Sequence, residues 1–189
     1  MKKVLTSISL TIFFLNCAKS QITKHNWLLG GNINYSSTNF NSENFGVPHN
    51  LNTLQINPNI GYFPLDKFAT GIKIGIEKIN VKEPGTSGYN RYTNLNLGPF
   101  VRYYLLKPIN NINILTEGAY LYGFEKGNSE KISKSTFLIS AGPVVYFNTV
   151  VGMEFLVSYS TQKFSGIKGN NNTIKFGIGL QVHLEKEEE

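Results

Sequence analysis

Apolar and polar residues alternate along most of this chain. Leu95, Leu97, Val101 and Tyr103, for example, are interleaved with small, polar or charged residues. Successive side chains of a β-strand point to opposite faces, so a period of two predicts strands with one apolar and one polar face. The pattern recurs eight times, and the expected strands are residues 27–36, 54–62, 70–77, 92–104, 114–124, 137–147, 151–160 and 174–184.

The connections between the expected strands alternate in length. Short turns follow the second, fourth and sixth strands, and longer polar segments follow the others. An up-and-down transmembrane barrel has this arrangement, with short turns on one rim and long loops on the other. Ten residues of about 3.3 Å each, tilted by about 40°, span about 25 Å, which is the height of the apolar band in such barrels. The long loops, which could bind an extracellular ligand, are expected at residues 37–52, 79–91, 125–134 and 162–172.

Three of the expected strands have similar sequences before a short turn. Residues 56–63, 97–104 and 141–147 each carry a Pro on the apolar face and two adjacent aromatic residues near the turn. Aromatic residues are enriched at the interfaces of membrane barrels, so these pairs predict an aromatic belt at one interface. Because Pro cannot donate to a strand ladder, the three prolines also predict bulges.

The first twenty residues have the features of a secretory signal peptide. Lys2 and Lys3 precede a short apolar run, and Ala18-Lys19-Ser20 forms a cleavage site, with cutting expected after Ser20. The run is too short to span a bilayer. Lipidation at Cys17 is an alternative. The expected division is therefore a signal peptide at 1–20, a barrel at 21–184 and a charged tail at 185–189.

Length and charge fit a single exported domain. The chain has 189 residues and a formal net charge of +6, and removing residues 1–20 with their three lysines lowers this charge to +3. The apparent basicity is thus half signal peptide, which argues against a nucleic-acid partner. The mature chain would have no Cys for disulfides or thiolate chemistry, and it has no apolar run long enough for a helical membrane span.

Taken together, the signal peptide, the eight alternating strands, the Gly-Pro hairpin strands and the last strand resemble a known family. The chain is similar to the small porin-like outer-membrane β-barrels of Gram-negative bacteria, of the OmpA/OmpX type. The resemblance covers residues 22–184. It implies an eight-stranded barrel in outer-membrane lipid, inserted by the barrel assembly machinery, and it implies no substrate.

The polar face of the expected barrel carries charges of both signs. In a membrane these side chains can face only the lumen, because each would cost a few kcal/mol on the lipid side. An eight-stranded barrel is just wide enough for side chains to fill it, so a structural ion-pair network is expected inside, with Arg102 diagonal to Glu117. A narrow gated ion path is the alternative. The six expected interior charges are Lys73, Glu77, Arg102, Glu117, Glu154 and Lys175.

Enzymatic and soluble alternatives are weaker. A lipid-modifying barrel hydrolase would need a Ser, a His and an acid together, but His183 is expected near the short-turn rim and Ser158 and Ser160 have no His beside them. No spacing of ligands indicates a metal, and no loop indicates a cofactor. A soluble lipocalin-like barrel would place the apolar face inside and the charged face outside. The favoured interpretation is a non-enzymatic outer-membrane barrel with a structural or surface-interaction role.

Overall fold

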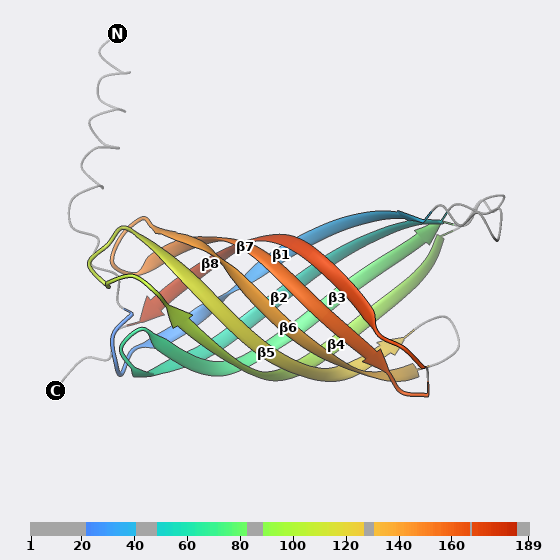
Figure 1. Cartoon of the computed structure of the whole chain (residues 1–189), viewed down its shortest axis with the longest axis horizontal. Coiled ribbons are helices and arrows are strands. Elements are labelled where there is room, and N and C mark those ends of the chain that lie inside the picture. The colour runs from blue at the N-terminus through green and yellow to red at the C-terminus, as the bar shows by residue number, and fades with distance from the viewer. Residues whose placement is uncertain (1–21, 41–48, 83–88, 127–130, 167, 185–189) are drawn as a thin grey trace, which may run out of the picture.

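The chain forms a closed barrel of eight antiparallel strands, each paired with its neighbours in sequence and the last with the first (Figure 1). The computed structural model describes residues 22–40, 49–82, 89–126, 131–166 and 168–184. Within these residues no helix is long and apolar enough to cross a membrane. The predicted all-β, eight-stranded architecture is confirmed. The strands are β1 (Trp27–Phe40), β2 (His49–Leu65), β3 (Phe68–Lys82), β4 (Tyr89–Tyr104), β5 (Ile112–Lys126), β6 (Lys131–Tyr146), β7 (Val151–Phe164) and β8 (Asn171–Leu184).

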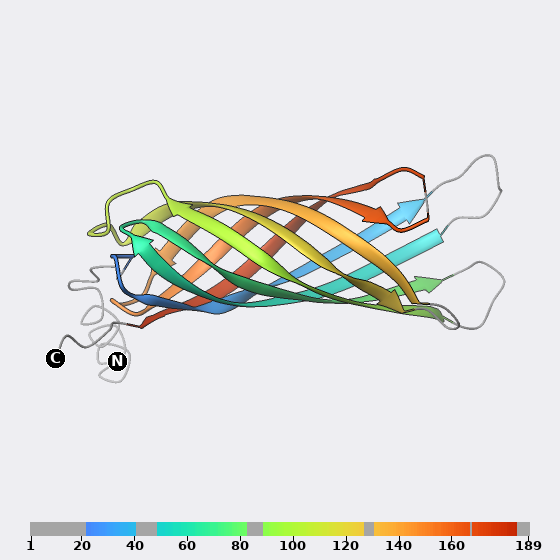
Figure 2. The same ribbon diagram turned by 90° about the horizontal axis from the view of Figure 1, so that it is seen from below.

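The strands are strongly tilted, as both views show (Figures 1 and 2). Following paired residues once around the barrel leads from Asn113 on β5, through Asn32 on β1, back to β5 at Gly123, ten residues further along. With eight strands about 4.8 Å apart and a rise of about 3.3 Å per residue, this offset corresponds to a tilt of about 40°. β1 pairs with β2 from Trp27 to Phe40. Its pairing with β8, which closes the barrel, is shorter and runs only from Trp27 to Tyr35.

The strands are longer than the alternation predicted. They have 14 to 17 residues, and they continue into all four segments that were expected to be long loops. Of these four segments, residues 165–166 and 168–170 are described and lie between strands, whereas 41–48, 83–88, 127–130 and 167 lie outside the described chain, as do the expected signal peptide and C-terminal tail. The error has a physical cause. Beyond the apolar band both faces of a strand can be polar, so pairing continues where the period of two is lost.

The three prolines on the apolar face do not create bulges, although the β2–β3 register shifts once nearer the turn, between Tyr62 and Leu65. On either side of Pro58, β2 keeps one register with β3, since Ile56 pairs with Ile76 and Asn59 with Lys73. The pairs between them are absent from the ladder, and the same interruption occurs around the other two prolines, with β4 against β5 and β6 against β7. Each Pro therefore removes local hydrogen bonding without shifting the strands, because the missing N–H leaves a gap but adds no residue.

The hairpin of β4 and β5 brings two charged residues directly opposite each other. Arg102 pairs with Glu117, rather than lying diagonal to it as predicted. The prediction placed the centre of the turn at Pro108, whereas the register is centred between Ile109 and Asn110. This pair is the starting point of the interior described next.

Candidate functional site

The outer wall of the barrel is apolar and exposed. Phe176 is 70% exposed and Ile178 55%, and similar side chains point outward from every strand. An apolar surface of this size on all sides is unusual for a protein in water and is the normal surface of a barrel in lipid. A soluble barrel with an apolar interior would require the reverse arrangement.

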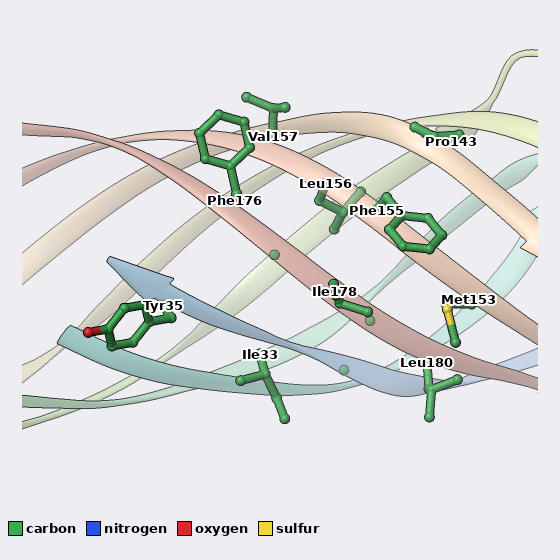
Figure 3. Close-up of a pocket in the computed structure, with 13 residues that line it drawn as sticks. Ile33, Tyr35, Pro143, Met153, Phe155, Leu156, Val157, Phe176, Ile178 and Leu180 are labelled. Atoms are coloured by element: carbon green, nitrogen blue, oxygen red, sulfur yellow. The ribbon is translucent and has the colours of Figure 1, made fainter. Parts of the chain in front are cut away.

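A shallow apolar groove runs along this wall over β7, β8 and β1. It has a volume of about 850 Å³, and Figure 3 shows Ile33, Phe155, Phe176 and Leu180 along it. The groove exists partly because Gly31 faces outward between larger neighbours and adds no side chain. Its lining is almost wholly hydrocarbon, so it offers no group for catalysis.

The interior contains a first cluster of charges near the short-turn rim. Glu117 is its centre: one carboxylate oxygen accepts from Nε and Nη2 of Arg102 at 3.1 and 2.6 Å, and the other accepts from Lys73. Nη1 of Arg102 donates to Glu154 at 2.9 Å. The four side chains are each 1% exposed or less. Two positive and two negative charges thus neutralise one another out of contact with solvent, as buried charges require.

Below this cluster a group of aromatic rings fills the short-turn end. Phe63, Tyr104 and Tyr146 surround His183, with ring centroids 5.6 to 6.1 Å from the imidazole. The Tyr104 hydroxyl donates to Gln181 at 2.7 Å and accepts from Arg102 at 3.4 Å. The aromatic floor, as we call Phe63, Tyr104, Tyr146 and His183, is therefore tied to the charge cluster above it.

The first described residues close the same end from outside the strands. Ile22 is fully buried, and its carbonyl accepts from the N–H of Lys67 in the β2–β3 turn at 2.8 Å. The N–H of Lys24 donates to Asp66 in that turn at 2.8 Å, and the N–H of His25 donates to Phe63 at 2.8 Å. Residues 22–26 thus form a strap across the short-turn rim.

A second charge cluster lies nearer the other end of the barrel. We call this end, opposite the short-turn rim, the long-hairpin end. Its centre is Glu77, four residues beyond Lys73 on β3 and so about 13 Å further along the strand. Glu77 accepts from Lys175 at 2.7 Å, from Lys134 at 3.2 Å and from Asn94 at 2.7 Å. This cluster contains one negative and two positive groups, so it has a net charge of +1.

Neutral polar side chains separate the two clusters. Asn57 donates to Asn32 at 2.7 Å, and the register places Asn57 across from Gly75, midway between Lys73 and Glu77 on β3. On the opposite side Ser140 and Ser158 share a hydrogen bond of 2.8 Å. The lumen is thus filled in layers by buried side chains from every strand.

The six charges singled out from the sequence all face the interior, but they divide between the two clusters. Lys134 was missed, because residues 125–134 were expected to be a loop. Alternate residues of β6, namely Thr136, Leu138 and Ser140, face inward, and Lys134 continues this series. Extending the alternation by one step could therefore have identified it. The predicted aromatic belt is half right: Tyr103 faces outward, whereas its neighbour Tyr104 belongs to the floor.

The described residues do not bring together the Ser, His and acid that a barrel hydrolase would need. His183 has Nε2 3.4 Å from Gln181 and is packed between rings, while Ser158 bonds to Ser140. His25 contacts the Tyr62 hydroxyl at 2.8 Å on the rim. Within the same part of the chain, no three His, Cys, Asp or Glu residues gather as metal ligands would.

Two solved structures with the same fold are a bacterial surface protein and a bacterial outer membrane protein. Neisserial surface protein A aligns with a TM-score of 0.53 and 7% identity, covering 83% of this chain and 96% of that one. The outer membrane protein OprG from Pseudomonas aeruginosa aligns with a TM-score of 0.55 and 11% identity, covering 89% and 99%. By sequence, the chain matches no family model and no curated protein. The chain therefore has the fold of the small outer-membrane barrels, as its sequence resemblance predicted.

Proposed function

We propose that the chain is an integral outer-membrane barrel with a closed lumen, acting as a structural or surface-interaction protein and not as an enzyme. The observation that carries the proposal is the division of the wall: apolar side chains are exposed outside, and charges are paired inside. Lipid can cover the first surface, and the second needs no solvent. The likeness in fold to barrels of outer membranes supports the same location.

The filled lumen favours a closed barrel rather than an ion path. A conducting pore needs polar groups that exchange with water along its whole length. In this barrel the Lys73, Arg102, Glu117 and Glu154 side chains are inaccessible and bonded to one another, and the aromatic floor lies below them. An ion would have to cross both layers.

The surface role rests on the long-hairpin end, where strands extend beyond the apolar band. A rigid scaffold of paired strands is suited to presenting a binding surface to an extracellular partner. Neisserial surface protein A, one of the solved barrels, carries a surface location in its name. Contact with outer-membrane lipid through the wall and insertion by the barrel assembly machinery are parts of the same proposal.

Envelope fractionation tests the location. We expect the protein expressed from its full sequence to appear in the outer-membrane fraction and to change gel mobility on boiling, as closed barrels do when they unfold. Recovery as a soluble periplasmic protein would overturn the proposal.

Cysteine labelling tests the orientation. The single Cys lies at position 17, within the expected signal peptide, so a new Cys is a unique probe. Lys168→Cys lies at the long-hairpin end, and we expect it to react with an impermeant maleimide on intact cells. Lys107→Cys, in the short β4–β5 turn, is the matched control and should react only after the outer membrane is permeabilised. The reverse result would invert the proposed topology.

A further inference from the structure

Two adjoining hollows lie on the outer wall over β4 to β7, towards the long-hairpin end. The larger, about 380 Å³, has Leu95, Leu97, Tyr122 and Phe124 among its lining residues. The smaller, about 210 Å³, shares Tyr122 with it and contains polar side chains. An apolar surface thus continues directly into a polar one. Besides the inward-facing Lys134, the hydroxyl and ammonium groups of the smaller hollow belong to Ser133, Ser135, Lys163 and Ser165, of which Ser133 also borders the larger.

Strand register holds these polar groups side by side. Ser135 pairs with Lys163 across β6 and β7, and the N–H of Ser165 donates to the carbonyl of Ser133 at 2.9 Å. Lys131 lies two residues beyond Ser133 on the same face of β6. Its ammonium is 3.8 Å from the centre of the Phe124 ring, close enough for a cation–π contact. Hydroxyl and ammonium donors therefore converge above an aromatic and aliphatic surface.

The positive charge on this face has no described acidic partner. Lys126 pairs with Lys131 across β5 and β6, and both are exposed, although like charges directly opposite each other destabilise a sheet. Lys163 adds a third exposed ammonium. The neighbouring acid, Glu125, occupies the alternate position on β5 and so faces the inside of the barrel. An anion bound from outside would relieve the repulsion.

We propose that this surface binds one phosphate-bearing acyl lipid of the leaflet at the long-hairpin end. The acyl chain lies along Leu95 and Leu97, and the phosphate accepts from Lys131, Lys163 and the serine hydroxyls. Lysine and hydroxyl donors are suited to phosphate oxygens. Basic groups at the edge of a bilayer bind anionic headgroups while apolar residues below them contact hydrocarbon. The proposal rests on the membrane location proposed above.

The two halves of the site specify the ligand jointly. The lysines alone could attract any soluble anion, and the apolar hollow alone could contact any acyl chain. Their contact through Tyr122 and Ser133, at the upper edge of the apolar wall, selects a molecule with both parts. The order of the parts, with hydrocarbon towards the middle of the wall and charge towards the rim, is that of a lipid in its leaflet.

Native mass spectrometry of the full-length folded protein in neutral detergent tests this site. The probe is bisphosphorylated lipid A, compared with the same lipid after removal of its phosphates and with inorganic phosphate as competitor. The variant is Lys131→Gln/Lys163→Gln. The matched control is Lys24→Gln/Lys107→Gln, which removes two exposed lysines from the opposite rim.

We expect the site variant to bind lipid A about thirtyfold more weakly than the wild type, from two lost headgroup contacts, and the control to bind normally. Dephosphorylated lipid should bind as weakly as lipid A does to the variant, and millimolar phosphate should not displace lipid A. Equal binding by variant and wild type, equal binding of both lipids, or displacement by phosphate alone would overturn the lipid site.

Fractionation and boiling-dependent gel mobility, read on the same preparations, separate this proposal from the previous one. A membrane-inserted, heat-modifiable protein without the expected lipid preference overturns the lipid site alone. A soluble protein overturns the membrane location itself.

Discussion

Arg102 and Glu117 lie directly opposite each other on β4 and β5 and are joined by two hydrogen bonds inside the barrel. Each also has a second charged partner, Glu154 for Arg102 and Lys73 for Glu117. The pair is therefore the middle of a chain of four charges, and it links strands that are distant around the wall.

Replacing either residue of this pair should destabilise the barrel strongly. Arg102→Ala or Glu117→Ala alone should lower the free energy of unfolding by about 3–5 kcal/mol, because each leaves a buried charge without one partner. The double variant should lose less than the sum by about 1 kcal/mol or more, since it removes both charges together. Urea unfolding in micelles, followed by the fluorescence of Trp27, measures all three.

A control comes from the other charge cluster. Arg102→Ala combined with Glu77→Ala should give losses that add within about 0.5 kcal/mol, because the two side chains share no partner. Additive losses for Arg102 and Glu117 as well would mean that their hydrogen bonds carry no coupling energy.

Glu77 should matter more than either lysine that it binds. Glu77→Gln removes the carboxylate with which the buried Lys134 and Lys175 form their described ion pairs, and should cost about 3 kcal/mol or more of unfolding free energy. Lys175→Met alone leaves Glu77 paired with Lys134 and should cost about 1 kcal/mol. Adding Lys175→Met to Glu77→Gln should restore part of the loss. Equilibrium unfolding in micelles gives the three values, and a further loss in the double variant would contradict the interpretation.

The apolar wall should reject a charge in a depth-dependent way. Ile72→Arg, near the middle of the wall, should reduce the free energy of folding into bilayers by about 2–4 kcal/mol. Ile109→Arg, in the exposed β4–β5 turn, is matched in chemistry and should cost less than about 1 kcal/mol. Equal effects at the two positions would show that lipid does not cover the wall.

The lumen should stay closed when only one of its two barriers is removed. Phe63→Ala/Tyr146→Ala opens the aromatic floor but leaves the charge cluster above it intact. We expect planar-bilayer currents at background level for the wild type and for this variant, with heat-modifiable mobility confirming that each is folded. Regular conductance steps from the wild type would favour the ion path instead.

The outward-facing residues of the apolar band were largely predictable from the alternation. The period of two depends on lipid on one side and a packed lumen on the other, and both constraints act on residues such as Ile74 and Lys73. The sorting of connections by length then distinguished a membrane barrel from a soluble one. The inward position of Arg102 and Glu117 followed from the same alternation. To predict that they lie directly opposite each other, one would also have to know the exact centre of the turn.

The interior layers could not be derived in the same way. Tyr104 and Phe63 alternate correctly, yet alternation does not say that side chains from β2, β4 and β6 meet around His183 on β8. That contact depends on the shear of the barrel, which brings residues distant in sequence to one height. The inward position of Lys134 was missed for another reason. Beyond the apolar band, outward-facing residues need not be apolar, so the sequence of a paired strand there cannot be distinguished from that of a loop.

The short pairing between β1 and β8 has a mechanical meaning. A cylinder of hydrogen-bonded strands unzips most readily where its ladder is shortest, and that seam joins the first strand to the last. The apolar groove of Figure 3 lies across it, so in the proposed membrane location hydrocarbon chains seated there would shield the backbone edge that is exposed first. The proposed location thus divides the barrel's resistance to opening between the protein and the surrounding membrane.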